Sequence, residues 1–171
     1  SGEFGGEIRV LSRDTWGSLW LRYTDEHKGR VVGFPLKDWA ALVDFTPPDT
    51  ASDTIIAEIG SRLSANGGTK YTLADGDTLW QRMFYLHGYQ ATLEDLLLAP
   101  ERCVELRDLI LRVMMRRLER LCRLEALDGV HFRDDWGTQE ALMIHPKIWR
   151  ENFNPAYARL FALVRDAGKH V

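Results

Sequence analysis

Residues 100–136 read PERCVELRDLILRVMMRRLERLCRLEALDGVHFRDDW, and this stretch decides the fold. Apolar side chains recur about every 3.6 positions in its first part, which predicts an amphipathic helix over residues 100–125. Pro100 suits the first turn of such a helix, because proline lacks the amide hydrogen that a first turn leaves unused. A turn and a compact apolar strand at residues 130–132 follow. A helix that leads into a short apolar strand is the repeating unit of an α/β protein.

The same alternation extends to both sides of this stretch. From residue 50 the predicted order is a helix carrying Ile55, Ile56, Ile59 and Leu63, a strand at residues 70–74, helices from residue 78, the strand at residues 130–132, helices between His145 and Gly168, and the start of a strand at residues 169–171. Such alternation predicts a parallel sheet of βαβ units. A complete (β/α)₈ barrel takes about 250 residues. We therefore expect an α/β fold that is a partial TIM (β/α)₈ barrel.

The first section of the chain has a different pattern. Short alternating runs at residues 7–11, 19–23 and 30–34 are separated by turn residues and predict antiparallel strands. Pro47-Pro48 ends the section as a rigid linker. We expect residues 1–49 to form a β-hairpin section and linker of the same domain, and residues 50–171 to form the βα units of an incomplete barrel.

Composition narrows the function classes. Hydrophobic residues make up 45% of the 171, charged residues 27%, and the net charge is −3, which is typical of a soluble globular domain and favours neither nucleic acid nor an anionic membrane as partner. The sequence shows no apolar run of membrane-spanning length and no signal peptide. Cys103 and Cys122 lie in one helical pattern at a separation of about 28 Å, too far for a disulfide. Reduced thiols favour a cytoplasmic location.

Acidic residues follow two of the predicted strands. Asp75 and Asp77 come after the first strand, and Asp134 and Asp135 come after the second. Reactive groups in parallel α/β proteins lie beyond the carboxyl ends of the strands, so these carboxylates are expected to converge. Neighbouring carboxylates raise one another's pKa, which suits a general acid or a site for cationic groups or a metal.

Each of these residues also has a structural interpretation. Asp is a common helix N-cap, and we expect Asp77 to be a cap more often than a site residue. A single cap does not need two adjacent acids, so Asp134 and Asp135 favour a functional role. His131 fits a barrel interior as well as a site. Arg133 fits a contact to a substrate carboxylate or an ion pair with one of the two adjacent acids.

Residues 128–139, DGVHFRDDWGTQ, with the following LMIHP and WRE runs, resemble a segment of the uroporphyrinogen decarboxylase superfamily, which includes corrinoid-linked methyltransferases. Upstream, the Asp14-Thr15-Trp16-Gly17 hairpin and the PLKDW run at residues 35–39 look like further parts of that family. The resemblance implies a TIM barrel. The hairpin is more similar to the methyltransferase-type branch than to the decarboxylases.

The resemblance implies two chemistries. The decarboxylases act without a cofactor on a tetrapyrrole with acidic side chains, and the methyltransferases move methyl groups to or from a corrinoid protein or thiol with zinc. Tyr85, in Tyr85-Leu86-His87-Gly88, resembles the decarboxylases' site tyrosine, and Asp135 stands where they have a site serine. The expected catalytic residues are Asp134, Asp135 and Tyr85, and the expected substrate-binding residues are Asp75, Asp77, Arg133 and His131.

Parts of both chemistries are missing from the sequence. The decarboxylases' N-terminal arginine motif is absent, the zinc-binding His-x-Cys would follow residues 169–171, and neither cysteine has zinc-ligand spacing. We expect no metal or cofactor in this chain, with zinc or a corrinoid possible in the complete enzyme. The hypotheses are a methyltransferase-type segment, a decarboxylase-type segment, and a non-catalytic half-barrel that acts by assembly as a homo-oligomer or with a companion chain; a corrinoid protein is a further possible partner.

Overall fold

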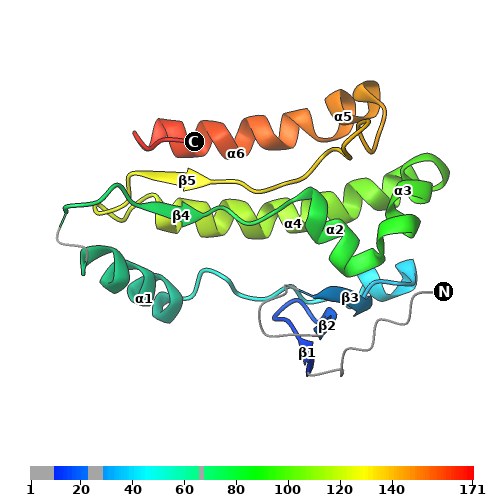
Figure 1. The fold of residues 1–171 in the computed structure, drawn as a ribbon, viewed down its shortest axis with the longest axis horizontal. Helices are drawn as coiled ribbons and strands as arrows, with labels where there is room; N and C mark the ends of the chain where they lie inside the picture. The colour runs from blue at the N-terminus through cyan, green and yellow to red at the C-terminus, as the bar shows by residue number, and fades with distance from the viewer. Residues whose placement is uncertain (1–9, 23–28, 66–67) are drawn as a thin grey trace. The chain divides into compact units, whose positions relative to one another are not determined.

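The computed structural model describes residues 10–22, 29–65 and 68–171 and divides into two compact units (Figure 1). The first, here called the hairpin unit, comprises Ser1–Pro48 and Arg82–Cys103. The second, the parallel unit, comprises Asp49–Gln81 and Val104–Val171. The hairpin unit therefore takes residues from a later part of the chain as well as the first section.

The hairpin unit contains the antiparallel sheet that the alternating runs predicted. Its strands are β1 (Val10–Arg13), β2 (Leu19–Arg22) and β3 (Arg30–Gly33), in that order across the sheet. Both strand pairs are antiparallel, and the β2–β3 register shifts between Leu19 and Trp20. Residues 7–9 of the first predicted run, and residue 23 of the second, lie outside the described residues.

One carboxylate organises the turn between β1 and β2. Oδ1 of Asp14 accepts hydrogen bonds from the amides of Trp16 (3.0 Å) and Ser18 (2.8 Å). Oδ2 accepts from the indole Nε1 of Trp20 at 3.0 Å and pairs with Arg82 at 3.2 Å. An Asp side chain that bonds amides two and four residues ahead fixes a tight turn. Asp14 of the Asp-Thr-Trp-Gly run therefore has a structural role in this turn.

The helical part of the hairpin unit comprises the 3-10 helix η1 (Trp39–Leu42), most of α2 (Trp80–His87) and all of α3 (Tyr89–Leu98). His87 is buried at their centre. Its Nδ1 donates to the Leu36 carbonyl oxygen (2.6 Å), and its Nε2 lies 2.9 Å from Oδ2 of Asp95. Trp39 donates its Nε1 to the same Oδ2 at 2.8 Å and stacks on the imidazole. We call these four residues the His87 network.

The parallel unit is built on the strand pair that the sequence predicted. Strands β4 (Leu73–Asp75) and β5 (Gly129–His131) pair in parallel, with Leu73 opposite Gly129 and Asp75 opposite His131, and their arrows in Figure 1 point the same way. A further parallel bridge joins Gly129 to His170, and the Val130 amide donates to the His170 carbonyl oxygen at 2.8 Å. The predicted strand start at residues 169–171 therefore lies beside β5.

Four helices belong to the same unit as this strand pair. They are α1 (Asp53–Ser64), α4 (Pro100–Leu121, in this unit from Val104), α5 (Pro146–Asn152) and α6 (Asn154–Asp166). Ser52 caps α1, and α4 begins at Pro100, which was predicted for its first turn. Helix α4 ends four residues before the predicted limit. Of the Asn66-Gly67-Gly68 run that predicts the end of α1, residues 66 and 67 lie outside the described residues.

The apolar period of α4 corresponds to burial. Five of its side chains in the parallel unit are at most 1% exposed: Leu106, Ile110, Met114, Leu118 and Leu121. Phe153, Leu160 and Val164 are buried to the same degree. Cys103 and Cys122 are buried free thiols, which confirms that they do not form a disulfide, and burial raises the pKa of Cys103 to about 12.

The architecture that follows is mixed α/β, with six α-helices, a three-stranded antiparallel sheet and a two-stranded parallel sheet in the described ranges. These residues form no closed barrel. The mixed α/β architecture is as expected, but a partial (β/α)₈ barrel remains a proposal. None of the helices in the described ranges combines the length and apolar character needed to cross a membrane.

Candidate functional site

The carboxyl ends of β4 and β5 bring three predicted site residues together. Asp75 and His131 are register partners, so they lie on the same face of the sheet, and both are exposed. Arg133 follows β5 and donates two hydrogen bonds to Asp75, from Nε to Oδ1 (3.1 Å) and from Nη2 to Oδ2 (2.6 Å). This fork geometry is the strong arrangement for a guanidinium and a carboxylate.

The charge of this pair is fixed at neutral pH. Partial burial raises the pKa of Asp75, but the hydrogen bonds from Arg133 and from the Asp77 amide bring it below its usual value. Asp75 is therefore an anion and not a proton donor near pH 7. A polar substrate at this sheet end would meet an anion, a cation and the imidazole of His131.

Asp134 has a different position. Its Oδ2 accepts from the Leu79 amide (2.7 Å) and from the Tyr157 hydroxyl, and its Oδ1 accepts from the Gln81 amide (2.9 Å). The two amides lie at the N-terminal end of α2, one just before the helix and one in its first turn, where backbone donors have no acceptor within the helix. Asp134 thus caps α2 from 53 and 55 positions further along the chain. The sequence predicted this capping role for Asp77.

Enclosure shifts the protonation equilibria of this group. Burial raises the pKa of Asp134, against the hydrogen bonds from Gln81, Tyr157 and Leu79, which favour the carboxylate. Burial and the nearby carboxylate also raise the pKa of Tyr157 far above its ordinary value. The tyrosine therefore stays a neutral hydrogen-bond donor at all physiological pH values.

The side chains of Asp77 and Asp135 accept hydrogen bonds from backbone amides of their own loops. Oδ1 of Asp77 accepts from the Thr78 amide at 2.8 Å, and its backbone has a φ of 66°, a left-handed conformation that Asp tolerates better than most residues. Asp135 is exposed, and its Oδ1 accepts from the Gly137 amide at 3.3 Å. Both contacts are typical of Asp in turns.

Tyr85 belongs to the hairpin unit. Its ring packs edge-on against Trp20, with the centroids 4.9 Å apart, and Arg82 lies over it at 5.4 Å. Its main-chain carbonyl accepts from Oγ of Ser18 at 2.7 Å. These contacts join Tyr85 to the β1–β2 turn and to β2, so Tyr85 has a packing role in its own unit.

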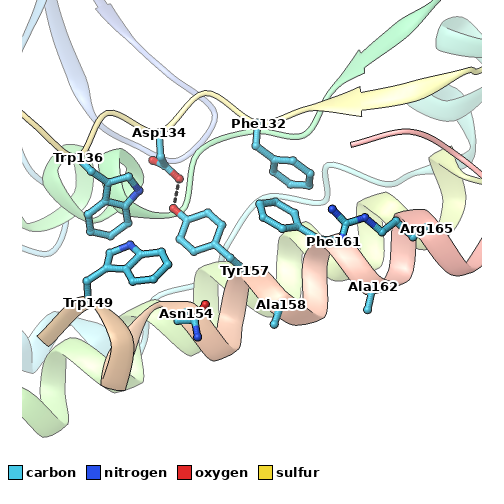
Figure 2. Close-up of a pocket in the computed structure, with 10 residues that line it drawn as sticks. All are labelled: Phe132, Asp134, Trp136, Trp149, Asn154, Tyr157, Ala158, Phe161, Ala162 and Arg165. Carbon is cyan, nitrogen blue, oxygen red and sulfur yellow. Dashed lines mark hydrogen bonds between the residues drawn. The ribbon is translucent and has the colours of Figure 1, made fainter. Parts of the chain in front are cut away.

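Sequence analysis missed a groove of about 480 Å³ in the parallel unit, shown in Figure 2. Its lining residues are Phe132, Asp134, Trp136, Trp149, Asn154, Tyr157, Ala158, Phe161, Ala162 and Arg165. We call it the aromatic groove. A signal was present: on α6 the rings of Tyr157 and Phe161 alternate with small Ala158 and Ala162, and such a helix face leaves a hollow.

Two tryptophans separate this groove from a second hollow of about 420 Å³. Trp136 and Trp149 line both, with their ring planes perpendicular. The second hollow is lined further by Leu142, Ile144, Pro146 and Arg150. The tryptophan of the Asp-Asp-Trp-Gly run is thus a wall between two surface hollows.

Comparison of the chain with protein-family models, curated proteins and solved structures found no match. Within the described residues, no group of three His, Cys, Asp or Glu side chains is arranged to hold a metal ion.

Proposed function

We propose that this chain is a segment of a (β/α)-barrel enzyme of the uroporphyrinogen decarboxylase superfamily, of the methyltransferase type, acting on a methyl group carried by a corrinoid or thiol. The observation that supports it is the parallel β4–β5 pair with polar side chains at its carboxyl end. The parallel bridge to His170 continues the strand order in one direction, as consecutive units of a barrel do.

Within this proposal, the substrate-facing groups are Asp75, His131 and Arg133. They are exposed at the end of the sheet where enzymes of this architecture hold their reactive groups. Asp134 is a positioning residue, because two amides and a hydroxyl already occupy its oxygens. Asp135 and Asp77 are loop residues of the same unit, and Tyr85, which packs within the hairpin unit, is not assigned a role in this site.

Ligand binding tests this proposal. We expect methylcobalamin to bind the chain saturably in an absorbance titration, and Arg133→Gln to weaken binding about tenfold, because one charged hydrogen-bonding group is worth about 1.4 kcal/mol. Arg159→Gln, at an exposed position on α6, is the matched control and should leave binding unchanged.

Uroporphyrin serves as the competing ligand in the same titration. Binding of the porphyrin without the corrinoid would replace the proposal by the decarboxylase type. If neither pigment binds, or if Arg133→Gln has no more effect than Arg159→Gln, this face is not the site of either chemistry.

A second candidate function, assembly without catalysis, is supported by exposed apolar side chains on the same sheet face. Leu73 alternates with Ala74 along β4, so it shares the face of Asp75, and it is 53% exposed. Tyr71 is 58% exposed, and its hydroxyl hydrogen-bonds Nδ1 of His170. Apolar residues beside an unpaired strand edge are typical of surfaces that associate.

We expect light scattering to give at least twice the monomer mass of 19.6 kDa, and Leu73→Lys to restore the monomer, because a buried ammonium opposes association. Leu97→Lys is the control, since Leu97 is 71% exposed in the hairpin unit. A wild-type chain that remains at 19.6 kDa over a wide concentration range would exclude the assembly function.

A further inference from the structure

We infer that the aromatic groove is a binding site for a small aromatic carboxylic acid, held by its ring against aromatic side chains and by its carboxylate on Arg165. The groove lies between the segment that follows β5 and helix α6 (Figure 2). It contains none of the substrate-facing groups proposed above, so this inference goes beyond the proposed function.

The size and walls of the groove suit one or two fused rings. A volume of about 480 Å³ is within the range of small-molecule sites, about 300–1,000 Å³. Phe132 and Phe161 meet edge to face with centroids 5.1 Å apart, and Trp149 and Tyr157 are within 17° of parallel. Phe132, Trp149 and Phe161 are each only partly buried, so their rings remain available to a ligand. A further ring would find edge and face contacts here.

The free charge of the groove is positive. Arg165 is exposed, and in the part of the chain that the structure describes its guanidinium has no hydrogen bond or ion pair. The carboxylate of Asp134 is at the other end of the groove, with Trp136, as Figure 2 shows. Its oxygens already accept from Leu79, Gln81 and Tyr157.

This distribution decides between an anionic and a cationic ligand. Aromatic walls alone would also suit an ammonium group through cation–π contacts. A cation in this groove would be repelled by Arg165, and it would find the oxygens of Asp134 already hydrogen-bonded. An anion instead finds a guanidinium able to bind a carboxylate with two parallel hydrogen bonds.

Helix α6 sets the direction of the ligand. Asn154, Ala158, Ala162 and Arg165 lie on one helical face, at spacings of four, four and three residues, and line the groove together (Figure 2). The two alanines line the groove, and longer side chains at these positions would reduce its volume. The ring therefore lies over Ala158 and Ala162, with its carboxylate toward Arg165.

The test uses three probes with one ring system and different charges. We expect indole-3-acetate to bind the chain about tenfold more tightly than indole or tryptamine in calorimetric titration. Arg165→Gln should remove this preference and leave indole binding unchanged. Ala162→Leu should abolish binding of all three, because leucine fills the groove while retaining high helix propensity.

Arg150→Gln is the matched control, because Arg150 is the arginine that lines the second hollow. It should leave indole-3-acetate binding unchanged, and circular dichroism should report the same helix content for all variants. The inference is overturned if tryptamine binds as tightly as the acid, if Arg150→Gln weakens the acid more than Arg165→Gln, or if none of the three probes binds.

Discussion

Replacing Asp134 by alanine is expected to lower the free energy of unfolding by about 3 kcal/mol. The change removes the acceptor for two amides at the N-terminal end of α2, those of Leu79 and Gln81, and for the Tyr157 hydroxyl. Loss of a helix cap is worth about 1 kcal/mol, and each buried donor left without a partner adds about 1–3 kcal/mol. Tyr157 is 6% exposed, so water does not readily replace the lost partner. Urea denaturation of the intact chain measures the effect.

The same variant has a defined pH dependence. Because burial raises the pKa of Asp134 above 3.8, the unfolded chain releases this proton at lower pH than the folded chain. The contribution of this group to stability is therefore complete below pH 3.8 and is lost as the pH rises through the raised pKa. We expect Asp134→Ala to be more destabilising at pH 4 than at pH 7. The depressed pKa of Asp75 has the opposite effect but is common to both proteins and cancels.

The neighbouring acid provides the matched control. Asp135 is exposed and accepts one 3.3 Å hydrogen bond from Gly137, so Asp135→Ala should change the free energy of unfolding by about 0.5 kcal/mol at most. Equal effects of the two variants would contradict the assignment of Asp134 as the cap of α2. A destabilisation by Asp134→Ala that grows from pH 4 to pH 7 would contradict the raised pKa.

His87→Ala is the second large expected effect, about 3 kcal/mol of destabilisation in the hairpin unit. The imidazole is 3% exposed, bridges the Leu36 carbonyl and Asp95, and stacks on Trp39 with ring centroids 3.9 Å apart. Removing a buried partner of a carboxylate is worth about 3–5 kcal/mol, which we reduce because Asp95 remains partly exposed and keeps its bond from Trp39.

Gln90→Ala is the control for this variant. Gln90 is exposed on α3, where its Nε2 donates to Oε1 of Glu94 at 2.7 Å, so the change should have an effect below about 0.5 kcal/mol. Hydrogen exchange of amides in α3 reports where stability is lost. An α3 that is as well protected in His87→Ala as in the wild type would refute the His87 network as the support of this unit.

Local patterns of the sequence determined the elements. The apolar period and Pro100 predicted the start and buried face of α4, because residues 3.6 positions apart lie on the same face of a helix. The starts of α1 and α5 are also local, because Ser52 and His145 cap them with hydrogen bonds to amides within one turn. The alternation of helices and strands predicted the parallel β4–β5 pair, since a strand that follows a helical crossover pairs in parallel.

Only the tertiary structure decided what the acidic residues do. Asp134 and Asp135 are adjacent and identical in type, yet one caps α2 and the other holds its own turn. No local pattern separates them, because the amides that Asp134 accepts from lie 53 and 55 positions away.

The aromatic groove has the same origin. Its walls come from the segment after β5 and from α5 and α6, and two short alanine side chains of α6 are among its lining residues. A sequence states which side chains are large, small or charged. Which of them enclose a common space depends on contacts between distant segments, and those contacts are made only when the chain has folded.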